Sequence, residues 1–81
     1  DHHEARKAIH NLDELLDEYL PRDCVLDMSG LNFMDSSGIA VVMRAQRRMQ
    51  ELGGSAAVVE VSPQARRVLH TAGIDRWIKI K

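Results

Sequence analysis

Helical patterns and strand patterns alternate along these 81 residues, and this alternation constrains the fold more than any other feature. Apolar residues recur at helical spacing in three segments, and short apolar runs separate these segments. The expected order is a helix over 5–19, a strand over 24–28, a helix over 39–52, a strand over 56–61, a helix over 65–72 and a short strand over 77–80. Strands that alternate with helices of this length pair in parallel through right-handed crossovers. The sequence therefore predicts one α/β domain over residues 1–81, with three mainly parallel strands and three helices.

Prolines and glycines mark the ends of these elements. Pro21 ends the first helix because proline disfavours helical geometry in the residue before it. Gly53-Gly54 ends the second helix, since glycine readily adopts positive φ. Ser62 followed by Pro63 is typical of an N-cap with proline at the first helical position, and Gly73 closes the third helix.

The burial of these elements is predicted from their apolar residues. Val25 and Leu26 are adjacent in the first strand, which is typical of a strand buried on both faces. The first helix carries basic residues early and acidic residues late, against the helix dipole, so packing of its apolar stripe has to stabilise it. On the second helix we expect one apolar side, formed by Ile39, Val42, Met43, Met49 and Leu52.

Charge and composition argue against several classes of protein. The 11 basic and 12 acidic residues give a formal net charge of -1, so we expect no nucleic-acid partner held by electrostatics. The longest apolar run, residues 39–43, is far shorter than the ~20 residues of a membrane-spanning helix, so we expect no direct membrane insertion. The single cysteine, Cys24, excludes an internal disulfide and favours a reducing, cytoplasmic setting. His2 and His3 point in different directions on a helix, and we expect neither a metal site nor a cofactor.

The most unusual segment is Phe33-Met34-Asp35-Ser36-Ser37-Gly38-Ile39, at the junction of a loop and the start of the second predicted helix. Two hydroxyl groups lie between a carboxyl group and a glycine, where free backbone N–H groups and the positive end of the helix dipole meet. One interpretation is a helix N-cap, because Asp and Ser are favoured caps. A cap needs only one of these polar residues, so a second interpretation makes one serine a phosphoacceptor. Neither serine has a histidine nearby in the sequence, and we expect no catalytic triad.

This motif and its surroundings resemble the STAS domain family, and within that family the bacterial anti-sigma factor antagonists. A DSSG sequence alone is weak support, whereas DSSG in a frame of apolar residues and glycines at family spacing is strong support. The matching segments are residues 1–3, 25–28, 31, 33–40, 53–54, 58–59, 62–63, 68–69, 73–74 and 77–80.

The resemblance implies a regulatory protein and not an enzyme. Members of the family bind an anti-sigma factor that is also a serine kinase, and they thereby release a sigma factor. The kinase phosphorylates the second serine of the DSSG motif, the modified antagonist dissociates, and a serine phosphatase restores it. Carried over to this chain, the phosphoacceptor is Ser37.

The predicted partner-binding surface surrounds Ser37. The resemblance implies that the residues on either side of Ser37 shape its loop, and that Asp1 matches an acidic position near the partner surface. The complete predicted partner-binding set is Asp1, Met34, Asp35, Ser36, Ser37, Gly38 and Arg44.

A basic face follows on the second helix, formed by Arg44, Arg47 and Arg48. One interpretation is a solvated face, since exposed helices normally carry such charge. The other is a contact with the partner, because Arg44 lies about two helical turns from Ser37.

The resemblance also implies a truncated form of the family fold. That fold normally starts with two strands ahead of the first helix, and both are absent from this sequence. The chain begins at Asp1 and not at methionine, which fits a fragment of a longer protein. Without those strands a central strand becomes an open edge, and open edges pair with other chains. We therefore expect self-association through the sheet edge.

Two other functions stay open. In the first, the chain is a structural STAS subunit of a larger assembly, such as a stress-sensing complex, a lipid-transport system or the tail of an anion transporter. In the second, the helix start at residues 35–38 grips the phosphate group of a nucleotide or lipid. Ser37→Ala separates this last function from a phosphorylation switch, because binding through backbone N–H groups survives the change and covalent phosphorylation does not.

Overall fold

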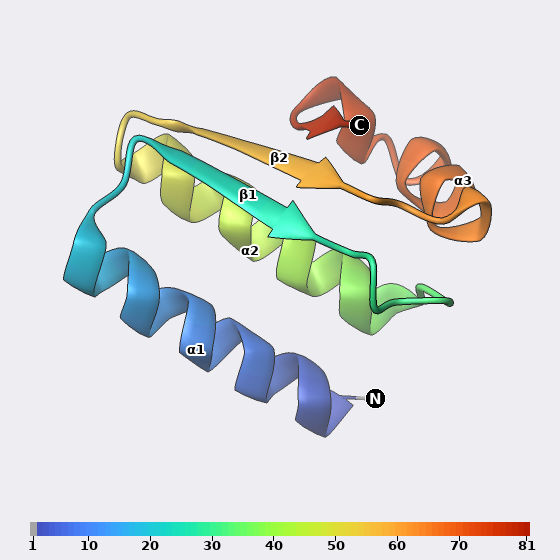
Figure 1. The fold of residues 1–81 in the computed structure, drawn as a ribbon, viewed down its shortest axis with the longest axis horizontal. Coiled ribbons are helices and arrows are strands. Elements are labelled where there is room, and N and C mark those ends of the chain that lie inside the picture. The colour runs from blue at the N-terminus through green and yellow to red at the C-terminus, as the bar shows by residue number, and fades with distance from the viewer. Residues whose placement is uncertain (1) are drawn as a thin grey trace.

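The computed structural model describes residues 2–81 and confirms an α/β fold with three helices and three parallel strands. Asp1 lies outside the described residues. The sheet has the order β1-β2-β3. In Figure 1, α1 and α2 lie side by side and run in the same direction, opposite to β1 and β2. The elements are α1 (His2–Tyr19), β1 (Asp23–Asp27), α2 (Ser36–Glu51), β2 (Ser55–Val59), α3 (Pro63–Thr71), a 3-10 helix η1 (Ile74–Arg76) and β3 (Lys79–Ile80).

The core lies between one face of the sheet and the helices α2 and α3. Val58 of β2 is completely buried, together with Val42 of α2 and Leu69 of α3. Since Val42, Val58 and Leu69 belong to one buried cluster, α2 and α3 contribute to the same core on this face of the sheet. The full cluster is Met34, Val42, Val58, Ala65, Leu69, Ile74 and Ile78.

The prediction that the first strand is buried on both faces is wrong. Burial alternates along β1, and Val25 is 62% exposed while Leu26 packs against the core. The physical reason is that α2 and α3 lie on one face, so in the described part of the chain the face that carries Val25 has no helix over it. In the same residues β1 pairs only with β2, which leaves β1 at an edge of the sheet.

Two predicted apolar stripes are covered only in part. On α2 the buried apolar positions are Val42, Ala45 and Met49, whereas Met43 is 56% exposed. Met43 follows Val42 by about 100° around the helix and therefore points away from the sheet. Among the α1 residues whose burial is described, residues 3–19, only Leu16 is buried, because α1 packs mainly against α2 and not on the sheet.

The predicted ends of the helices are confirmed in most cases. Leu20, before Pro21, leaves helical geometry with a φ of 44°. Gly53 and Gly73 adopt φ values of 74° and 76° after α2 and α3. Gly54 has a different reason to be glycine, since an added Cβ would lie 2.1 Å from the carbonyl oxygen of Arg22.

The C-terminal segment differs from the prediction. The final strand was expected to begin at Trp77, but β3 contains only Lys79–Ile80, and Trp77 follows the 3-10 helix with 72% of its surface exposed. The second strand also ends earlier than expected, at Val59, because Glu60 takes a φ of 57°. Left-handed geometry at Glu60 ends the extended backbone before α3 begins.

Candidate functional site

The start of α2 is fixed by an aspartate cap. Asp35 has extended backbone geometry, and its Oδ1 accepts hydrogen bonds from the backbone N–H of Ser37 at 3.0 Å and of Gly38 at 3.4 Å. The cap interpretation of the motif is therefore confirmed for Asp35. The carboxylate occupies two of the N–H groups with which a helix start grips a phosphate, which disfavours a nucleotide or lipid site at this position.

Met34 was predicted to contact a partner, and the structure corrects this prediction. Its side chain is 1% exposed and belongs to the core. An added Cβ on Gly38 would lie 2.8 Å from the Cγ of Met34, so the glycine is required by this close packing. Met34 thus packs against Gly38 at the helix start and exposes almost no surface to a partner.

A glutamine on α3 holds the loop before the site. The Gln64 side chain accepts a hydrogen bond from the backbone N–H of Met34 at 2.8 Å and donates one to its carbonyl at 2.9 Å. Both hydrogen-bonding groups of the Met34 backbone are therefore satisfied by one amide. No local sequence pattern indicates this contact, since 30 residues separate the two partners.

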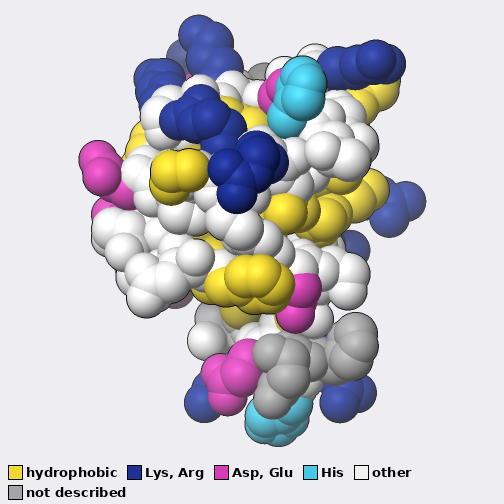
Figure 2. Space-filling model, turned by 90° about the vertical axis from the view of Figure 1, so that its right-hand side faces the viewer, with side chains coloured by type: hydrophobic (Ala, Val, Ile, Leu, Met, Phe, Trp, Pro, Cys, Tyr) yellow, Lys and Arg dark blue, Asp and Glu magenta, His cyan; other side chains and the backbone are white. Residues whose placement is uncertain are grey.

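Ser37 lines a groove of about 380 Å³ between the start of α1, the loop after β1 and the start of α2. Figure 2 looks onto the end of the molecule at which α2 begins, and hydrophobic side chains are visible across the middle of this face. The groove contains the carboxylates of Glu4 and Asp35 but no Lys or Arg among its described residues. Phe33, which belongs to the singled-out segment but not to the predicted partner-binding set, also lines the groove and is 65% exposed. The site is thus an acidic and partly apolar groove.

The two serines of the motif differ in exposure. Ser37 is buried, with 8% of its surface exposed, and among the described residues it is the only polar residue that is buried. Ser36 is exposed. Ser37, the predicted phosphoacceptor, is therefore the less accessible of the two serines.

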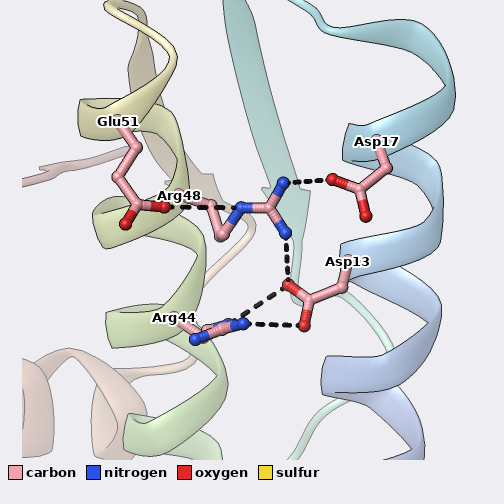
Figure 3. Close-up of polar contacts among 5 residues, drawn as sticks. All are labelled: Asp13, Asp17, Arg44, Arg48 and Glu51. Carbon is pink, nitrogen blue, oxygen red and sulfur yellow. Dashed lines mark hydrogen bonds and ion pairs between the residues drawn. The ribbon is translucent and has the colours of Figure 1, made fainter.

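Arg44, predicted as a partner contact, is bound to α1 inside the chain. Figure 3 shows its guanidinium facing Asp13, with Nε–Oδ1 and Nη2–Oδ2 distances of 3.1 and 2.9 Å. Arg48 reaches the same carboxylate at 3.0 Å and also bonds Asp17. These hydrogen bonds, above all the one from Arg44, lower the pKa of Asp13. Neither interpretation of the basic face included this network, and only Arg47 of the three arginines is solvent-exposed.

In residues 2–81 no group of three or more His, Cys, Asp or Glu side chains is placed to hold a metal ion. Among the helices described, none is both long and apolar enough to cross a membrane.

The sequence matches the STAS domain over residues 1–81. This chain belongs to the STAS domain family. It is 32% identical over 80 residues to the anti-sigma F factor antagonist of Paenibacillus polymyxa. The aligned region covers 99% of this chain and 68% of that protein. The protein of the same name from Lysinibacillus sphaericus is 26% identical over 78 residues, or 96% of this chain and 67% of that protein.

Solved structures agree with this assignment. A crystal structure of a candidate anti-sigma factor antagonist from Thermotoga maritima superposes with a TM-score of 0.76 at 26% identity, over 93% of this chain and 67% of that one. An NMR structure of the same protein gives a TM-score of 0.78 at 25% identity, over 95% of this chain and 64% of that one. This STAS domain thus spans about two thirds of the length of these relatives, and their names place them among regulatory proteins.

Proposed function

We propose that this STAS domain is an anti-sigma factor antagonist whose partner binds at the groove beside Ser37. In this proposal the partner is an anti-sigma factor with serine kinase activity, and its binding releases a sigma factor in the cytoplasm. Phosphorylation of Ser37 ends the binding, and a serine phosphatase restores it. The observation that carries the proposal is the second serine of a DSSG motif on the wall of a groove, in a chain related to proteins named anti-sigma F factor antagonists.

The electrostatics of the groove support a switch. A phosphate adds about -1.5 to -2 charges at neutral pH. The carboxylate of Asp35 already accepts hydrogen bonds from the backbone N–H groups of Ser37 and Gly38. The helix start therefore has few N–H groups left to hydrogen-bond a phosphate. The phosphate would stand beside the carboxylates of Asp35 and Glu4 in a groove without described basic side chains. Phosphorylation therefore makes an acidic surface strongly acidic.

The magnitudes are sufficient for an effect on the partner. The helix dipole favours a negative group at a helix N-terminus by ~0.3–1 kcal/mol, which offsets part of the repulsion between the phosphate and the carboxylates of Asp35 and Glu4. One unit of like charge about 5 Å away, at an effective dielectric constant near 20, costs roughly 3 kcal/mol. A hundredfold loss of affinity requires only ~2.7 kcal/mol. An acid or a bound nucleotide phosphate on the partner is therefore sufficient.

Access to Ser37 adds a requirement. Since Ser37 is 8% exposed, a kinase has to open the groove to reach its hydroxyl. One wall of the groove consists of Glu4 and Ala5 at the start of α1, a helix with little buried apolar surface. We infer that this wall moves when the kinase binds, and we propose no enzymatic activity for the chain itself.

The proposal is tested by a pull-down from a lysate of the organism that encodes this chain. Wild-type protein, Ser37→Ala and Ser36→Ala are used as baits, with and without ATP, and mass spectrometry identifies the retained proteins. We expect all three baits to retain an anti-sigma factor kinase, and ATP to release it from wild type and from Ser36→Ala only. If the retained proteins are other STAS proteins or membrane components and ATP has no effect, the chain is an assembly subunit instead.

A further inference from the structure

The C-terminal part of the chain carries an excess of positive charge that the net charge conceals. Residues 62–81 contain five basic residues and one acidic residue, a formal charge of +4, in a chain whose formal net charge is -1. Residues 1–61 therefore carry -5. In Figure 2, Lys and Arg side chains gather over α3 at the top of the face.

In the described part of the chain, no Lys or Arg side chain of this segment lies within ion-pair distance of a carboxylate. Arg66, Arg67, Arg76 and Lys79 line a groove of about 610 Å³ formed by α3, η1 and β3, and none of the four forms an ion pair there. Among the described residues that line this groove, the only carboxylate is that of Asp75, whose Oδ2 lies 2.6 Å from Nδ1 of His70. This groove differs from the α1–α2 interface, where the arginines are neutralised.

An apolar groove adjoins the basic one at Trp77. Trp77 is 72% exposed and lines both grooves. The second groove, of about 340 Å³, also contains Ile74, Ala72 and the exposed Met43 of α2. Trp, Met and Arg are the residues enriched at protein interfaces, and tryptophan is prominent among the residues that carry binding energy.

We propose that these two grooves bind an acidic protein segment that carries a large apolar side chain. Its carboxylates pair with Arg66, Arg67, Arg76 and Lys79, and its apolar side chain enters the groove between Met43 and Trp77. A protein segment fits better than a bilayer because the apolar part of the surface is concave, and a flat membrane surface does not fill a groove. This surface shares no lining residue with the groove at Ser37, so the inference is independent of the function proposed above.

The only tryptophan of the chain reports on this surface directly. The probe is a short synthetic peptide rich in glutamate, with two leucines one helical turn apart. We expect a saturable shift of the Trp77 emission to shorter wavelength, with an affinity that falls as salt is added. The double change Arg76→Glu and Lys79→Glu should weaken binding by about tenfold or more. Arg47→Glu is the matched control, because Arg47 is exposed, lines neither groove and should bind the peptide like wild type.

Three further probes decide the class of partner. A peptide with lysine in place of glutamate should give no shift, and a peptide with serine in place of leucine should bind more weakly by about tenfold. Absence of a saturable shift with the acidic leucine peptide overturns the inference. Equal binding of the serine peptide also overturns it, because the apolar groove then has no role. A shift of the Trp77 emission that phosphatidylcholine–phosphatidylglycerol vesicles produce and the peptide does not also overturns the inference. In that case the two grooves contact a membrane surface.

Discussion

The two sides of α2 stabilise the molecule by different means. Towards the sheet, the apolar side chains of Val42, Ala45 and Met49 are at most 1% exposed. Towards α1, Arg44 and Arg48 make ion pairs with carboxylates that stay partly exposed to water. Buried apolar contacts are not weakened by charge screening or by protonation, whereas exposed ion pairs are weak and sensitive to both. The difference indicates that α1, and with it one wall of the groove at Ser37, can move while the core stays intact.

Truncation on the core side should have the largest effect. Met49→Ala removes a side chain that is 1% exposed and should lower the free energy of unfolding by ~2–5 kcal/mol. Met43→Ala is the matched control on the same helix, and because Met43 is 56% exposed it should change stability by less than ~0.5 kcal/mol. Urea denaturation followed by circular dichroism measures both. If both variants lowered the free energy of unfolding equally, the placement of Met49 in the core and of Met43 outside it would be refuted.

A methyl group at the start of α2 should have the next largest effect. Gly38→Ala places a Cβ 2.8 Å from the Cγ of Met34. Because Met34 is buried, its side chain cannot move away without disturbing the core. We expect a loss of ~1–3 kcal/mol from this overpacking. Gly30→Ala is the control, since an added Cβ there meets nothing within 4 Å. A Gly38→Ala protein as stable as the Gly30→Ala protein in urea would show that the helix start tolerates the extra atom.

Changes on the α1 side should be smaller and should depend on pH and salt. Asp13→Asn weakens the contacts of Arg44 and Arg48 and should cost less than ~1 kcal/mol at neutral pH and low salt. The pKa of Asp13 is lowered in the folded state, so its contribution is complete above about pH 4 and is lost as the pH falls through the lowered value. Thermal unfolding from pH 7 to pH 2, with Glu18→Gln as an exposed control, measures this. A difference between wild type and Asp13→Asn that persists at the lowest pH contradicts the ion-pair assignment.

The smallest effect concerns the uncovered side of the sheet. β1 lies at the sheet edge in the described residues, with Val25 62% exposed beside it. We expect weak self-association of the 81-residue chain through this edge, because an unpaired strand accepts another chain. Light scattering over a concentration series measures it, and Val25→Lys should reduce it. A monodisperse monomer at high concentration would count against this prediction.

The parts of this molecule that local chemistry determines could be predicted from the sequence. The cap by Asp35 and the helix ends at Gly53 and Gly73 depend on neighbouring residues alone. The parts that depend on tertiary arrangement could not be predicted. The Gln64 contact with Met34 joins residues 30 positions apart.

The same distinction explains the wrong predictions. The exposure of Val25 and Met43 depends on which face each neighbouring element covers, and an apolar residue type gives no information on that. Trp77 was assigned to a strand because an apolar residue beside Ile78 fits a strand pattern. The structure instead leaves it exposed after a 3-10 helix.

The account rests on Ser37 as the phosphoacceptor, although Ser36 is the more exposed serine. The most direct test incubates the purified protein with ATP and the anti-sigma factor kinase recovered in the pull-down, and maps phosphate to single residues by tandem mass spectrometry. The account predicts phosphate on Ser37 in wild type and in Ser36→Ala, and none in Ser37→Ala. Phosphate on Ser36, or on no residue between 35 and 38, would contradict it.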